Sequence, residues 1–223
     1  MSKLAVYEFT GIIAPGALTI FGFSRIYPAI GVLVADDKIS FGEFGLLLIL
    51  AYVVGHLVQA LGNIVEPAFW FILRGIPTDW PRSDAHGLLA KQQAAALPSK
   101  VRDILKIDCP DSLKSLDRKS WFSITRQIYA ATKRAGQAER VDIFNGNYGL
   151  MRGVAASLFL IAVATTIQSP ATLSIWWFPF LLGLALALLR MHRFAVHYAR
   201  ELFVQFLSVT NEKAAEPEPE KSE

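Results

Sequence analysis

The sequence predicts an all-α protein, a four-helix transmembrane bundle with a small helical cytosolic domain inserted between the second and third spans. Hydrophobic residues make up 53% of the 223 residues, and a mean hydropathy of +0.37 is high for a soluble domain. The charged residues, only 18% of the chain, gather between two pairs of long apolar stretches and behind the last one. The single Cys109 excludes an intramolecular disulfide.

Residues 1–72 form the first predicted hairpin of two spans. The first span covers about Ala5–Tyr27, and the second runs from about Phe44 towards Trp70. Each contains the roughly 20 mostly apolar residues that an α-helix needs to cross a bilayer. Pro15 lies inside the first span and has no backbone N–H, so we expect a kink or break there.

Residues 73–147 are too polar to span a membrane and predict a basic helical cytosolic domain. They contain 13 basic and 8 acidic residues, an excess of five positive charges. We expect one helix to begin near His86 and to end at Pro98, and a longer helix over residues 120–134. From about Glu139 the helical pattern continues into the third span.

Residues 148–209 form the second predicted hairpin and its cytosolic extension. The spans cover about Tyr148–Ile167 and Thr172–Leu189, and helical periodicity then continues to Val209. The charged, proline-interrupted tail 210–223 is predicted to be disordered.

Basic residues orient the chain in the membrane. They are concentrated in residues 73–147 and after Leu189, whereas the two remaining connections hold one lysine between them. By the positive-inside rule, the protein is expected to be a multi-pass protein of the inner (cytoplasmic) membrane. Both termini and the inserted domain would lie in the cytosol.

A polar stripe interrupts the second span at spacings of three, four and three residues. On an ideal helix these side chains fall within an arc of roughly 80°. Polar groups on an apolar membrane helix should face protein or water rather than lipid. The stripe therefore either lines a pore or ligand path, or only joins helices by hydrogen bonds. It consists of His56, Gln59, Asn63 and Glu66.

Two basic groups are candidate binding sites for an anionic ligand, either a nucleotide or a single-stranded oligonucleotide. The alternatives are contact with membrane lipid headgroups, a solvated helix face, and a core position for Trp121. One group is a row below the fourth span, formed by Arg190, Arg193, His197 and Arg200. The other interleaves basic and aromatic residues of the inserted domain, Lys119, Trp121, Arg126, Lys133 and Arg134.

The predicted topology brings Glu66 to the same depth as three arginines, Arg152, Arg190 and Arg193. Such a cluster could latch the bundle in one state. The sequence contains no GxSxG, Walker, HExxH or CxxC motif. We therefore predict no catalytic residue, metal or cofactor.

The layout of apolar spans and a basic cytosolic domain resembles the small multi-pass membrane effectors and sensors of bacterial anti-phage defence. The resemblance covers the whole chain and implies a membrane-disrupting homo-oligomer controlled by a cytosolic ligand or protein partner. The first hypothesis is accordingly a ligand-gated ion channel. The alternatives are a non-conducting membrane subunit that recruits a soluble partner, and a small membrane transporter or enzyme.

Overall fold

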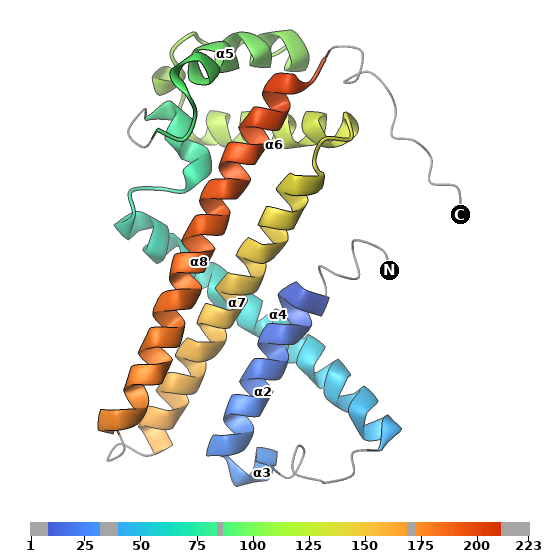
Figure 1. The fold of residues 1–223 in the computed structure, drawn as a ribbon, viewed down its shortest axis with the longest axis vertical. Coiled ribbons are helices and arrows are strands. Elements are labelled where there is room, and N and C mark those ends of the chain that lie inside the picture. Colours follow the sequence, from blue (N-terminus) through green and yellow to red (C-terminus); the bar gives the residue numbers. More distant parts are fainter. Residues whose placement is uncertain (1–8, 32–39, 84–86, 169–172, 211–223) are drawn as a thin grey trace. The chain divides into compact units, whose positions relative to one another are not determined.

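Three long helices dominate the computed structural model, which describes residues 9–31, 40–83, 87–168 and 173–210 and is all-α within them (Figure 1). Among these residues, three helices are long and apolar enough to cross a membrane. They are α4 (Phe41–Ile72), α7 (Glu139–Gln168) and α8 (Leu173–Ser208). The shorter elements are η1 (Phe9–Ile13), α2 (Ala14–Ile26), α3 (Pro28–Gly31), η2 (Pro77–Arg82), α5 (Lys91–Leu105), η3 (Leu113–Ser115) and α6 (Arg118–Arg134).

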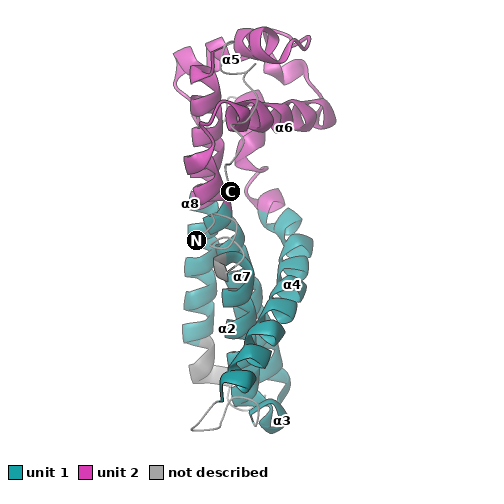
Figure 2. Cartoon of the chain, turned by 90° about the vertical axis from the view of Figure 1, so that its right-hand side faces the viewer, with its two compact units in different colours: residues 1–69, 146–193 teal, residues 70–145, 194–223 magenta. Residues whose placement is uncertain are grey.

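The chain divides into two compact units (Figure 2). Unit 1 comprises Met1–Phe69 and Gly146–Arg193, and unit 2 comprises Trp70–Asn145 and Phe194–Glu223. The boundaries after residues 69 and 145 lie within three residues of the domain boundaries expected after residues 72 and 147. The predicted extension of the last span, from Phe194 onward, groups with unit 2 rather than with the hairpin, because its apolar face is part of the core of unit 2.

Close backbone contacts set the helix directions in unit 1. A Cβ atom on Gly16 would overlap the Ala51 carbonyl, and one on Gly55 would overlap the Ile12 carbonyl, so α2 and α4 run in opposite directions. Contacts of Pro15 with Gly153, and of Gly22 with Ile161, show that α2 and α7 run in the same direction. Small residues at such crossings let helix backbones approach closely.

Pro15, where a kink or break was expected, lies at the start of α2, where the helix changes from π-helical to α-helical. It occupies the second position of α2, and the preceding residues, Phe9–Ile13, form the π-helical η1. The first turn of an α-helix tolerates proline, because its N–H groups have no intrahelical acceptor. The expected first residues of the span, 5–8, lie outside the described residues.

Unit 2 is organised around Trp121, which is fully buried on α6. Its indole N–H donates to the Thr78 carbonyl at 2.7 Å, and its ring stacks on Phe203 of α8 at 5.9 Å between centroids. The expected helix end at Pro98 is wrong, because α5 continues through this buried proline to Leu105. Packing of α5 against the core outweighs the one backbone hydrogen bond that proline removes.

Parts of other predicted segments lie outside the described residues. They include His86, where the first helix of the inserted domain was expected to begin. They also include residues 169–171 of the turn between the last two spans and residues 211–223 of the tail.

Replacement of Gly55 by alanine is expected to destabilise the bundle by about 1–3 kcal/mol, because the new methyl group would collide with the backbone of η1. Gly45 on the same helix is the matched control, since a Cβ there meets no atom within 4 Å. Gly45→Ala should be neutral or slightly stabilising. Unfolding of the purified variants in mixed detergent micelles measures both effects, and equal stability of the two variants would contradict this packing.

Candidate functional site

Gln59 joins three helical segments of unit 1 through its side-chain amide. Its Nε2 donates to the carbonyl oxygens of Gly11 at 2.5 Å and Gly149 at 2.9 Å. Its Oε1 accepts from Arg152, at 3.0 Å from Nη2 and 3.3 Å from Nε. Both amide protons and the oxygen therefore have partners. Gly11 lies four residues before Pro15, so the regular α-helical donor to its carbonyl is missing and Gln59 supplies one.

Glu66 and Arg152 form an ion pair next to this amide. Arg152 Nη1 lies 2.6 Å from Glu66 Oε2, and the two side chains are only 23% and 20% exposed, in the order Glu66 and Arg152. Tyr148, one turn before Arg152 on α7, donates its hydroxyl to Glu66 Oε1. Gly62 makes room for the arginine stem, since a Cβ there would lie 3.1 Å from Arg152 Cγ. We call Gln59, Glu66, Tyr148 and Arg152 the polar network.

A second set of polar contacts joins α2 to α7. Thr19 Oγ1 lies 2.9 Å from Ser157 Oγ, and both hydroxyls lie within hydrogen-bonding distance of the Pro15 carbonyl oxygen, at 3.0 and 2.9 Å. Both residues are buried. Thr19 and Ser157 were not predicted as site residues, although hydroxyl residues inside apolar spans commonly bond between helices.

The predicted polar stripe divides into two pairs. Gln59 and Glu66, seven residues apart, face α7 and belong to the polar network. His56 and Asn63, also seven residues apart, are exposed, and His56 contacts the Tyr52 ring edge-on at 4.6 Å. Seven residues return a helix to nearly the same direction, which explains the pairing. A pore-lining role for these four residues stays a prediction.

A cavity of about 130 Å³ lies beside the ion pair in unit 1. Its wall is almost entirely apolar, and its charged members, Glu66 and Arg152, are already paired. A void with such a lining stays dry and suits an apolar group rather than a polar ligand. The lining residues are Leu61, Gly62, Val65, Glu66, Phe69, Arg152, Ala155, Ala156, Phe159, Leu184, Leu188 and Met191.

Trp121 cannot stack on a ligand, because its ring is 0% exposed. For this residue the ligand-binding expectation is wrong and the alternative, a core position, is correct. Its basic neighbours on α6 are exposed: Lys119, Arg126, Lys133 and Arg134.

The row Arg190, Arg193, His197 and Arg200 is divided between the units, with its first two members in unit 1 and the others in unit 2. In unit 2, His197 stacks on Phe144 at 5.3 Å, and Arg200 Nε donates to the Leu88 carbonyl at 3.2 Å. Of the three arginines proposed for a cluster with Glu66, Arg152 forms an ion pair with it. Its role in gating stays a prediction.

The described residues contain no group of three or more His, Cys, Asp or Glu side chains that could hold a metal ion. Cys109 is buried, and burial raises the pKa of its thiol, so the nucleophilic thiolate is disfavoured at neutral pH. No protein-family model, curated protein or solved structure matches the chain.

Replacement of Gln59 by leucine should destabilise unit 1 by about 1–3 kcal/mol, because it removes the donor to Gly11 and the acceptor of Arg152. Asn63→Leu is the matched control, since it makes the same kind of exchange at an exposed position of α4. Asn63→Leu should leave the free energy of unfolding in mixed micelles unchanged or slightly higher. If both variants unfold alike, the amide of Gln59 does not hold the helices together.

Proposed function

We propose that the chain is an integral membrane protein that assembles as a homo-oligomer and works as a gated ion channel. The ion pair between Glu66 and Arg152 would hold the closed state, and an anionic ligand or a protein partner bound by unit 2 would open it. The observation that carries the proposal is this ion pair between two apolar helices. Charged residues inside membrane helices are costly and mark functional positions by default.

Helix directions in unit 1 support a fourth span. Phe9–Ile26, covered by η1 and α2, has 18 residues and a length of roughly 27 Å, close to the roughly 30 Å of a bilayer core. The helix α2 runs in the same direction as α7 and in the opposite direction to α4. These directions are expected when one hairpin of two spans is followed by a second hairpin whose first span crosses in the original direction. Four passes with both termini in the cytosol are therefore part of the proposal.

The polar network has the properties of a latch. Its interactions join α4 to α7 through side chains, so they can be exchanged without unfolding either helix. A partly buried ion pair also has a high cost if one partner is lost, typically about 3–5 kcal/mol. Separation of α4 from α7 would expose Gln59 and Glu66 together with His56 and Asn63, the complete stripe that was predicted to line a pore.

A non-conducting membrane subunit is the second candidate. The specific observation in its favour is that every hydrogen-bonding group of the Gln59 amide already has an interhelical partner. A network of this kind can hold a bundle together with no further role. In that case unit 2 would recruit a soluble partner. The role in anti-phage defence that the layout implies also stays a prediction.

Ion flux in proteoliposomes tests the channel. Glu66→Gln should raise the unstimulated flux on the order of 10-fold. Loss of the ion pair should lower the stability of the closed state, relative to the open state, by about 1.4 kcal/mol or more. The exchange of charges, Glu66→Arg with Arg152→Glu, should return the flux towards that of the wild type. Glu43→Gln is the control, since this exposed carboxylate of α4 bonds to Ser40 of its own N-terminal turn.

Absence of flux from all of these variants, with or without anionic compounds in the medium, would exclude the channel and leave the non-conducting subunit. A monomer in native mass spectrometry of the reconstituted protein would contradict the homo-oligomer.

A further inference from the structure

The charged residues of α6 are all basic, and one of them, Arg118, forms an ion pair with Asp79 at 3.3 Å. The helix contains five basic residues and no acidic residue. Asp117 lies just before it as the N-cap and accepts from the backbone N–H groups of Lys119 and Ser120. The Ser120 hydroxyl and these backbone groups lower the pKa of Asp117. This carboxylate is therefore engaged by the helix N-terminus.

The basic residues of α6 follow a seven-residue period. Lys119, Arg126 and Lys133 are exposed and lie on nearly the same side of the helix, because seven residues make almost two full turns. Successive members are separated by about 10.5 Å along the axis. The opposite side, which includes Trp121 and Ile128, is buried in the core of unit 2.

Two aromatic residues lie beside the charges, the exposed Phe122 and the half-buried Tyr129, whose hydroxyl donates to the Asp142 carboxylate at 2.6 Å. Phe122 is 56% exposed, and the guanidinium of Arg126 lies 5.9 Å from its ring centroid. Lys133 Nζ lies 6.0 Å from the ring of Tyr129. The apolar face of α6 is buried in the core of unit 2, so Phe122 is the apolar side chain that remains available for insertion between headgroups.

We propose that α6 is a docking helix for an anionic phospholipid surface, with Lys119, Arg126 and Lys133 bound to headgroups and Phe122 inserted between them. The three cations form a straight row along a convex helix face, which matches an extended anionic plane. A nucleotide would instead require basic groups that converge on one phosphate cluster. Charge complementarity to acidic lipids strengthens binding roughly fivefold for each basic residue near the surface.

Chain connectivity keeps α6 near a bilayer. Only the residues between Arg134 and Glu139 separate α6 from α7, one of the three helices long enough to span. The first nine residues of α7, 139–147, precede the predicted span and add roughly 14 Å, so α6 stays within a short distance of the membrane surface. The inference deepens the proposed function, because it names the anionic partner of unit 2, and it rests on the membrane-integral part of that proposal but not on conduction.

A fluorescent label on the exposed face of α6 tests the docking. The label is attached to the Ser123→Cys variant of the full chain, next to Phe122, with the buried native Cys109 left in place and the unsubstituted chain as the blank. The protein is reconstituted into nanodiscs of phosphatidylcholine alone, or of phosphatidylcholine with phosphatidylglycerol. The same label on the Ala95→Cys variant, at an exposed position of α5, serves as the control. Quenching by a nitroxide-labelled phospholipid reports contact with the bilayer.

We expect strong quenching of the label at position 123 only in nanodiscs that contain phosphatidylglycerol, and its loss in about 1 M salt, where the Debye length is about 3 Å. The triple substitution Lys119→Gln, Arg126→Gln and Lys133→Gln should lower the docked-to-undocked ratio on the order of 100-fold or more. All three positions are exposed, so the fold should remain intact, which the far-ultraviolet circular dichroism of the variant checks.

Equal quenching of the α6 label in the two kinds of nanodisc would overturn the docking, and so would equal quenching of the α5 control label. Protection of the α6 label by a single-stranded oligonucleotide in neutral nanodiscs, without lipid-dependent quenching, would assign the face to nucleic acid instead. Neither readout requires ion flux. A silent channel with lipid-dependent quenching would contradict the proposed conduction and leave the docking in place.

Discussion

The carbonyl oxygen of Gly11 has no regular α-helical donor, because the residue four positions on is Pro15, and Gln59 of the neighbouring helix bonds to this oxygen. In water the carbonyl would be solvated, whereas between apolar helices an unpaired group costs several kcal/mol. Gln59 of α4 supplies the donor at 2.5 Å and uses its second N–H for Gly149 of α7. These two hydrogen bonds join η1, α4 and α7, and the glycines at 55 and 153 allow the helices to approach closely.

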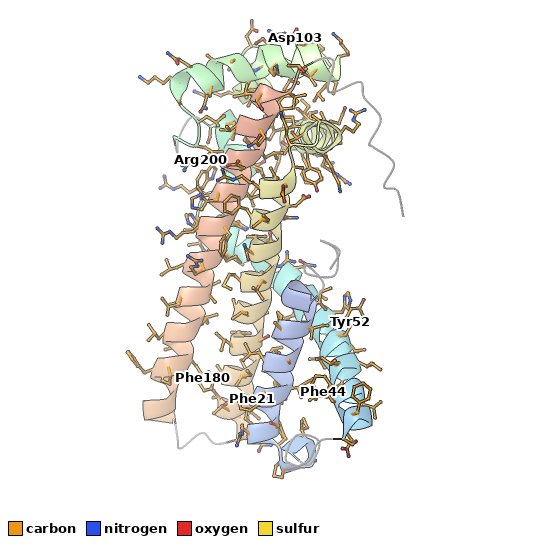
Figure 3. All side chains as sticks on the ribbon, turned by 45° about the vertical axis from the view of Figure 1, so that its right-hand side comes forward. Phe21, Phe44, Tyr52, Asp103, Phe180 and Arg200 are labelled. Carbon is orange, nitrogen blue, oxygen red and sulfur yellow. The ribbon has the colours of Figure 1, made fainter. Side chains whose placement is uncertain are left out.

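Charge is handled in different ways in the two units. In unit 1, Glu66 and Arg152 are paired and bonded to Tyr148 and Gln59, as partly buried charges between apolar helices must be. On α6 of unit 2, Arg118 pairs with Asp79, whereas the basic side chains of Lys119, Arg126, Lys133 and Arg134 are exposed. The helix α4 also has exposed side chains, such as Phe44 and Tyr52 (Figure 3). In contrast to those of α6, these side chains are aromatic and suited to contact with lipid. The charges inside unit 1 therefore bind each other and join two helices. The exposed basic side chains of α6 are available to bind a partner.

Hydropathy and periodicity were sufficient to predict the long helices, including the continuous run of α8 beyond the apolar span. Topology also predicted that Glu66 would meet Arg152, because both lie near the same end of adjacent spans. The two sides of the polar stripe could not be separated from sequence, since an arc of roughly 80° does not state which edge faces α7. The burial of Trp121, the continuation of α5 through Pro98 and the role of residues 194–208 in the core of unit 2 all depend on contacts distant in sequence, which local propensity does not encode.

The most direct test of the central claim is a double-mutant cycle on Glu66 and Arg152 in a bilayer, with leucine at either position or at both and the free energy of unfolding as the readout. The polar network predicts that each single substitution leaves the other charge without its partner, so the double substitution should cost less than the sum of the two single substitutions. The coupling energy should be about 1–3 kcal/mol in favour of the pair. Additive effects of the two substitutions would mean that the ion pair does not hold α4 against α7, and the account of unit 1 as a latched bundle would be wrong.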